Sequence, residues 1–333
     1  MDTGTFGITL RSLATPTDIS YGGTVHAGKI LEWIDKAGYA CAVGWSRHYC
    51  VTAYVGNIRF TRPIQIGDLV EAHARLIHTG RTSMHILVKI HSADPRQGSF
   101  VQATECMMVF VAVDSYGSSA PVPCWEPNDD EEHQLQMFAM QRIDVRRQIE
   151  KEMELQTYPE GGGAANTTLR FLAAPSDVNW GGKVHGGMVM RWIDEAAYVS
   201  AVTWSKKPSV AVYAGGVRFY HPIAIGDLIE VQARILYTGR TSMHVAVHVR
   251  SKSLKSQQCI LTTECLVVFV ALDEQRRPTP VPSWQPTSSA DKSLEQHAIR
   301  LMELRGRNPV QNKFYPGGLL CALCRFSVFL PVR

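Results

Sequence analysis

Two long apolar stretches dominate the pattern of hydrophobic and polar positions in this chain. Residues 25–43 and 184–202 contain mostly Ile, Leu, Val, Met, Ala, Trp and Tyr, with few polar positions between them. A helix with so little polar surface is buried on nearly every side. We therefore predict two long central helices, each preceded by a short strand, such as "ITLRSLA" (8–14), and a loop rich in Pro, Asp and Gly.

Four strand-like segments follow each predicted helix. Residues 70–76 alternate apolar and polar side chains with a period of two, and residues 84–90 do the same. The turn sequences "IGD" (66–68) and "HTGRT" (78–82) separate these segments, and 101–113 has the apolar character of a central strand. One buried helix followed by an antiparallel sheet predicts a sheet wrapped around that helix, which is the hotdog architecture of the α+β class.

The whole unit occurs twice, with a constant spacing of 159 residues between matching positions such as Asp35 and Asp194. "FTRPIQIGDLVEAHARLIHTGRTSMHI" in the first copy matches "FYHPIAIGDLIEVQARILYTGRTSMHV" in the second. Polar helices are predicted at 129–155 and 293–307, after each sheet. The predicted organisation is hotdog domain 1 (1–126), a helical linker (127–166), hotdog domain 2 (167–285), and a C-terminal helix and tail (286–333). Because one hotdog leaves an open sheet edge, we expect the two sheets to join edge to edge, with the helices side by side.

Composition and charge narrow the possible functions. A net charge of +4 over 333 residues, without a basic block, argues against nucleic acid as a partner. No apolar run reaches the roughly 20 residues of a membrane span, and the N-terminus does not have the pattern of a secretory signal. The eight scattered cysteines, including the lone Cys321-x-x-Cys324 pair, favour reduced thiols in the cytoplasm and predict no metal site.

The candidate chemistry centres on Asp35 and Asp194, which lie inside the two apolar helices. An unpaired buried carboxylate costs several kcal/mol, so a repeated one needs a partner or a function. One hypothesis is a general base, because partial burial raises the pKa of a carboxyl group toward neutrality. The alternative is a structural acid that binds loop amides. The Rossmann, Walker, GxSxG and HExxH motifs are absent, which leaves attack by water or a carboxylate.

Other repeated residues are candidates for binding the substrate. His26 and His185 begin the helices and act either in acid–base chemistry or in orienting the loop. Gly28 and Gly187 either let a substrate approach the backbone or allow close packing of helix and sheet. Side chains suited to a phosphate lie in "TGRTSM" and near it, although each could instead face solvent; they are Arg81, Ser83, Arg240, Ser242, Arg59 and Arg218.

These motifs, taken together and in order, resemble a known family. "LRxLAxPxD", "VHxG", "WID", "GDLxE", "TGRTSM" and "PVP" are similar to the acyl-CoA thioesterase group of the hotdog superfamily, over nearly all of 8–126 and 167–285. The tandem layout resembles the cytosolic long-chain acyl-CoA hydrolases of the brain type. The resemblance implies that Asp35 and Asp194 are catalytic, that the substrate is acyl-CoA, that no cofactor is needed beyond the coenzyme A of the substrate, and that three chains assemble into a homo-oligomer.

The chain also departs from that family. The brain-type enzymes have an asparagine two residues before the motif histidine, where this chain has Thr24 and Lys183. We expect Asp194 to face the loop 21–28, with Thr24 as a polar neighbour, and Asp35 to face the loop 180–187. A lysine beside Asp35 would lower the pKa of that carboxyl group, which predicts that Asp194 is the more active site. Two alternatives to acyl-CoA hydrolysis remain: an enoyl-thioester hydratase or dehydratase that uses the histidines, and an acyl-CoA-binding protein without turnover.

Overall fold

The first repeat folds as one helix on a curved antiparallel sheet in this computed structural model, which describes residues 6–20, 23–156, 158, 166–256 and 258–306. Its helix, α1 (Ala27–Ser46), follows strand β1 and a short 3-10 turn. The strands of this repeat are β1 (Gly7–Leu13), β2 (Tyr49–Val55), β3 (Ile58–Arg59), β4 (Leu69–Thr79), β5 (Ser83–Ala93) and β6 (Val101–Val113). Helix α2 (Asp130–Glu154) follows the sheet. The tail after residue 306, with Cys321 and Cys324, and the glycine-rich stretch 159–165 lie outside the described residues.

The second repeat has the same order of elements. Its central helix is α3 (Gly186–Ser205), and α4 (Ser289–Gly306) follows the sheet. Its strands are β7 (Asn166–Leu172), β8 (Ser209–Phe219), β9 (Leu228–Thr238), β10 (Ser242–Lys252) and β11 (Cys259–Ala271). Strand β8 runs without interruption through the region that β2 and β3 share in the first repeat, so the strand count of the first repeat is one higher than we predicted.

The two sheets form one continuous sheet. The described strands follow the order β1-β4-β5-β6-β2-β8-β11-β10-β9-β7, and β3 also pairs with β8. The repeats meet at the antiparallel pair of β2 and β8, where Tyr54 lies opposite Arg218 and Val55 opposite Val217. This pairing covers the edge that each hotdog would otherwise expose. The predicted edge-to-edge double hotdog is confirmed.

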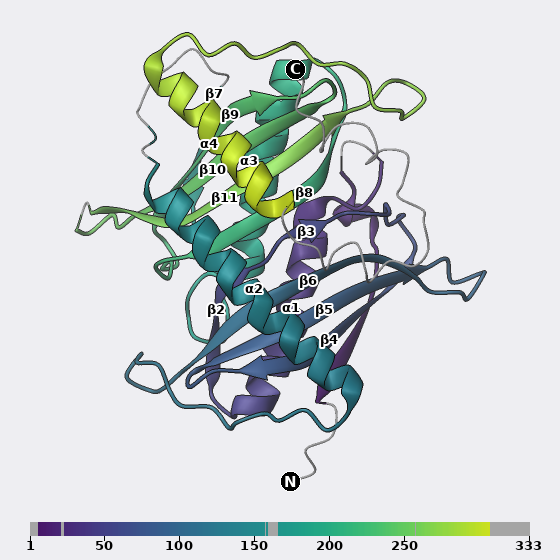
Figure 1. Ribbon diagram of the computed structural model, residues 1–333, viewed down its shortest axis with the longest axis vertical. Coiled ribbons are helices and arrows are strands. Elements are labelled where there is room, and N and C mark those ends of the chain that lie inside the picture. Colours follow the sequence, from purple (N-terminus) through teal and green to yellow (C-terminus); the bar gives the residue numbers. More distant parts are fainter. Residues whose placement is uncertain (1–5, 21–22, 157, 159–165, 257, 307–333) are drawn as a thin grey trace.

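The helices lie on opposite faces of this sheet (Figure 1). The central helices α1 and α3 pack against one face and against each other, while α2 and α4 cover the other face. One hydrophobic core runs through both repeats on the side of the central helices and includes Ile34, Phe110, Ile193 and Phe269. Because this core is shared, the groups at the contact between α1 and α3 are buried between the two repeats.

Both central helices begin two residues later than we predicted. Val25 and Val184 are still extended and bridge to Ile19 and Val178, and His26 and His185 then act as N-caps. The capping ring nitrogens accept hydrogen bonds from amides of the first turn, which would otherwise have no partner. The two histidines are thereby fixed at the contact between the repeats.

Three absences hold for the described part of the chain. None of its helices is long and apolar enough to cross a membrane. It contains no group of three or more His, Cys, Asp or Glu side chains that could hold a metal ion. Its six cysteines are all free thiols, and burial raises the pKa of Cys41 to about 12 and that of Cys50 to about 11.

Candidate active site

The loop before each central helix is held by an aspartate in a short 3-10 turn. Asp18 accepts a hydrogen bond from the amide of Thr15 at 2.8 Å, and its own carbonyl accepts one from the amide of His26 at 3.1 Å. Asp177 does the same for the amide of His185, at 2.9 Å. The "PxD" segment of the sequence therefore fixes the backbone of the motif histidine.

The two central helices approach so closely that only glycine fits at the contact. A Cβ added to Gly28 would lie 2.7 Å from Cα of Arg191, and one added to Gly187 would lie 2.8 Å from Cα of Glu32. The amide of Gly28 donates to Oδ2 of Asp194 at 3.0 Å, and the amide of Gly187 donates to Oδ2 of Asp35 at 2.9 Å. The prediction that each aspartate faces the glycine-rich loop of the other repeat is confirmed.

The carboxylate of Asp35 has a full set of partners. Besides the Gly187 amide, it accepts a hydrogen bond at Oδ1 from the hydroxyl of Thr52, at 2.7 Å. Oδ2 also lies 2.8 Å from Nδ1 of His185. Thr52 lies in β2 at a β-bulge, where the register with β6 shifts between Thr52 and Tyr54. A bulge turns a side chain away from the regular alternation, and here it accompanies a hydroxyl beside a carboxylate that is 2% exposed.

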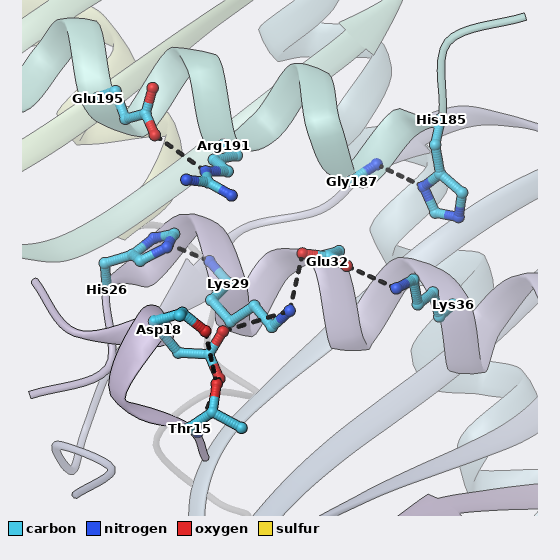
Figure 2. A network of polar contacts seen from close by, with 11 residues as sticks. Thr15, Asp18, His26, Lys29, Glu32, Lys36, His185, Gly187, Arg191 and Glu195 are labelled. Atoms are coloured by element: carbon cyan, nitrogen blue, oxygen red, sulfur yellow. Dashed lines mark hydrogen bonds and ion pairs between the residues drawn. The ribbon is translucent and has the colours of Figure 1, made fainter. Parts of the chain in front are cut away.

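The protonation of His185 is linked to Asp35. Burial alone would lower the pKa of His185, but its hydrogen bond and charge interaction with Asp35 raise the pKa above its usual value. In the protonated ring Nδ1–H donates to Asp35. In the neutral ring Nδ1 is instead an acceptor for the Gly187 amide, 3.1 Å away (Figure 2). His185 and Asp35 therefore form a buried pair that changes its hydrogen bonds with pH.

The carboxylate of Asp194 has fewer partners. It keeps the bond from the Gly28 amide, but Nδ1 of His26 lies 3.8 Å away, beyond hydrogen-bond distance. The position that matches Thr52 is Ala211, so no hydroxyl stands there. Asp194 is 9% exposed, more than Asp35.

The space around the two carboxylates differs as well. A Cβ on Gly186 would lie 3.1 Å from Oγ1 of Thr52 and 3.2 Å from Oδ2 of Asp35, so the absence of a side chain leaves that face of both groups uncovered. The matching residue is Ala27, whose methyl group stands at the corresponding place. Asp194 instead borders a cavity of about 680 Å³ that residues of both repeats line.

Charged side chains surround the crossing of the helices. On α1, Glu32 lies between Lys29 and Lys36, and on the facing helix Arg191 pairs with Glu195 (Figure 2). Burial alone would raise the pKa of Glu32, but the ammonium groups of Lys36 and Lys29 hold it below its usual value. The matching positions 32 and 191 thus carry opposite charges in the two repeats.

The polar neighbours expected from the loops are only partly in place. Thr24 is buried and lines the cavity beside Asp194. Lys183 is exposed, and its backbone amide donates to the side chain of Asn179. The basic group in contact with Asp35 is His185, so the reason given for a weaker Asp35 does not hold.

The predicted phosphate-binding arginines lie away from the two carboxylates. Arg218 is paired with Glu150 and Glu154 of α2, on the opposite face of the sheet. Arg59 borders a small pocket under the same helix. The exposed Arg81 and Arg240 lie in the β4–β5 and β9–β10 turns, with Ser83 half-buried and Ser242 fully buried at the starts of β5 and β10. A role for Arg218 in binding a phosphate is therefore corrected to an ion pair that fastens α2 to the sheet.

Sequence reasoning missed two features of the site. Thr52 lies outside every motif, and its signal is the mismatch with Ala211 in otherwise similar strands. The arginines that do border the cavity were also missed, because they lie in segments where the repeats differ; they are Arg62, Arg191 and Arg276.

Comparison with known proteins places this geometry in a family. The thioesterase superfamily matches the chain twice, at residues 22–99 and 181–256. A Zymomonas mobilis protein, named as an uncharacterized acyl-CoA thioester hydrolase, is 33% identical over 37% of this chain and 83% of its own length. The chain belongs to the thioesterase superfamily.

Other members of the superfamily match both repeats together. The cytosolic acyl coenzyme A thioester hydrolase of Mus musculus is 25% identical over 90% of this chain and 84% of its own length. A solved structure from Lactobacillus plantarum, described as an oleoyl thioesterase, is similar with a TM-score of 0.56. It covers 81% of this chain and 98% of its own, at 11% identity, and supports the fold alone. This thioesterase-superfamily chain therefore has relatives with one repeat and with two.

Proposed function

We propose that this protein hydrolyses acyl-CoA to a fatty acid and coenzyme A, chiefly at Asp35. The observation that carries the proposal is the buried contact of the Asp35 carboxylate with the Thr52 hydroxyl, next to the open face at Gly186. Relatives named acyl-CoA thioester hydrolases support the substrate class. Asp194 has the weaker set of partners and contributes less.

Asp35 is proposed as the general base. Thr52 donates its proton to Oδ1, which leaves its oxygen lone pairs free to accept a hydrogen bond from water at the uncovered face. Asp35 takes a proton from that water, and the water oxygen attacks the thioester carbonyl carbon. The carbon–sulfur bond then breaks, and the coenzyme A thiolate takes up the proton as it leaves.

The start of α3 is proposed to stabilise the carbonyl oxygen. In the described part of the chain the amide of Gly186 has no hydrogen-bond partner, and it lies at the positive end of the helix dipole. The next amide, that of Gly187, is occupied by Asp35. Gly187 and Gly28 therefore serve to pack the helices and orient the carboxylates, and Gly186 is the donor nearest the reacting groups.

A second candidate function is hydration or dehydration of an enoyl thioester. The observation in its favour is the 2.8 Å contact between His185 and Asp35, since such reactions need an acid and a base beside one another. The two candidates differ in product, because only hydrolysis releases a free thiol.

The assembly and location remain proposals of lower resolution. Three double hotdogs in a homo-oligomer are proposed from the family resemblance, and relatives named cytosolic hydrolases support a cytoplasmic enzyme. The mass of the purified protein in solution tests the assembly directly.

The test of function is thiol release from a panel of acyl-CoA esters of increasing chain length, followed with a thiol reagent. We expect release above the uncatalysed rate for at least one chain length. The same samples are examined for hydrated or dehydrated thioesters by mass spectrometry. No thiol release with any ester would reject hydrolysis, and a change in enoyl-CoA without thiol release would favour the second candidate.

A further inference from the structure

The cavity beside Asp194 has the form of a ligand site. Its volume of about 680 Å³ lies within the range of about 300–1,000 Å³ that is typical of pockets for small molecules and cofactors. Residues of both repeats line it, and its apolar walls include Ile30, Phe60, Val199 and Phe269. Such walls suit an acyl chain or the pantetheine arm of coenzyme A.

Three arginines give this cavity a basic rim. Arg62 and Arg276 are exposed, and Arg191 comes from the central helix α3. Arg276 reaches across the contact between the repeats, because its Nη1 lies 3.9 Å from the place of a Cβ on Gly23. Arginine binds phosphate through two parallel hydrogen bonds, so a set of three matches the phosphates of coenzyme A.

This basic rim belongs to one side of the molecule only. The positions that match Arg62, Arg191 and Arg276 in the other repeat are His221, Glu32 and Gly117. The exposed ion pair of Arg191 with Glu195 is worth little in water and does not prevent Arg191 from binding a phosphate. The cavity has therefore acquired anion-binding groups where its counterpart has none.

The reacting groups have changed in the opposite sense. Beside Asp194, Ala211 stands where Thr52 assists Asp35, and Ala27 fills the place that Gly186 leaves open. His26 is 3.8 Å from the carboxylate, whereas His185 is 2.8 Å from Asp35. The cavity side has kept the space for a ligand and lost the groups that position water.

We propose that the cavity beside Asp194 is a second ligand site, which binds a coenzyme A thioester through Arg62, Arg191 and Arg276 without hydrolysing it. The phosphates lie at the arginine rim and the acyl chain runs along the apolar walls. This inference rests on the proposed function for the class of ligand. It goes beyond that function, because binding here is separate from turnover at Asp35 and makes the protein responsive to its own substrate.

The test counts binding sites with a non-hydrolysable thioether analogue of an acyl-CoA, by isothermal titration calorimetry on the full chain. We expect two equivalents per chain for the natural protein and for Asp35→Asn. The double variant Arg191→Ala, Arg276→Gly takes the second change from Gly117 of the other repeat. It should bind one equivalent as before and the other at least about tenfold more weakly, because charge-assisted hydrogen bonds are lost. Arg147→Ala, on the exposed surface of α2, is the matched control and should bind two.

The outcomes separate this proposal from the proposed function. A single equivalent in the natural protein, or two unweakened equivalents in the arginine variant, would overturn the second site. Circular dichroism and thermal melting confirm that each variant is folded. Absence of thiol release with two equivalents bound would reject hydrolysis and leave the ligand site standing. Thiol release with one equivalent bound would do the reverse.

Discussion

The centres at Asp35 and Asp194 share one backbone plan and differ in a few side chains. Both carboxylates accept a hydrogen bond from a glycine amide of the other repeat, at 2.9 Å and 3.0 Å. Only Asp35 has a threonine hydroxyl and a histidine within hydrogen-bond distance. Only Asp194 borders the large cavity. Duplication copied the geometry, and later substitutions gave one side the groups for chemistry and the other the space and charge for a ligand.

The comparison also shows why both aspartates are retained. Each one binds an amide at the start of the opposite helix, where partial positive charge favours a carboxylate. Each therefore holds the two repeats together, whatever else it does. A buried acid in a repeat is thus compatible with catalysis on one side and with structure on the other.

The largest expected effect comes from removing the charge at Asp35. Asp35→Asn should lower kcat by about 100-fold or more, because a general base typically contributes 10² to 10⁴ in rate. Asp194→Asn should lower it by less than about threefold, since that centre lacks the hydroxyl that positions water. Steady-state thiol release by both variants measures the difference. Equal losses would show two equivalent sites, and a larger loss at Asp194 would reverse the assignment.

A smaller effect is expected at the position where the strands differ. Thr52→Ala removes one hydrogen bond to Asp35 and should lower kcat by about five- to tenfold. The reciprocal change is Ala211→Thr with Ala27→Gly, made in the Asp35→Asn background, and it should raise the residual rate. Single-turnover thiol release detects both effects. If Thr52→Ala has full activity, the hydroxyl only orients the carboxylate for packing.

The smallest effect is the pH dependence that His185 gives to the Asp35 centre. Its pKa is raised above 6.5 by Asp35, so the imidazolium binds the carboxylate below that range and releases it as pH rises. We expect kcat to increase by less than tenfold as pH passes above 6.5, and His185→Gln should flatten the profile. The sign for stability is opposite, because the pair stabilises the fold below pH 6.5 and loses this contribution as pH rises through the folded-state pKa. A pH series of chemical unfolding and of kcat tests both signs.

The sequence was sufficient for the fold because the information was periodic and written twice. Alternating strands, apolar central helices and matching motifs predicted the double hotdog, and the shared sheet at β2 and β8 follows from the need to cover open edges. The position of the aspartates also followed, since a carboxylate in an apolar helix needs a partner. Helix starts were placed two residues early because capping depends on the backbone of the loop, which periodicity does not report.

The chemistry around the aspartates depended on tertiary structure. A lysine two residues before a histidine is adjacent in sequence, but Lys183 turns to solvent while His185 turns to Asp35. Thr52 is 17 residues from Asp35 and reaches it through a bulge in β2. Arg62, Arg191 and Arg276 come from three separate segments and meet only around the cavity. Sequence periodicity determines which faces are buried, and the meeting of distant side chains in a polar site is decided only when the two repeats pack together.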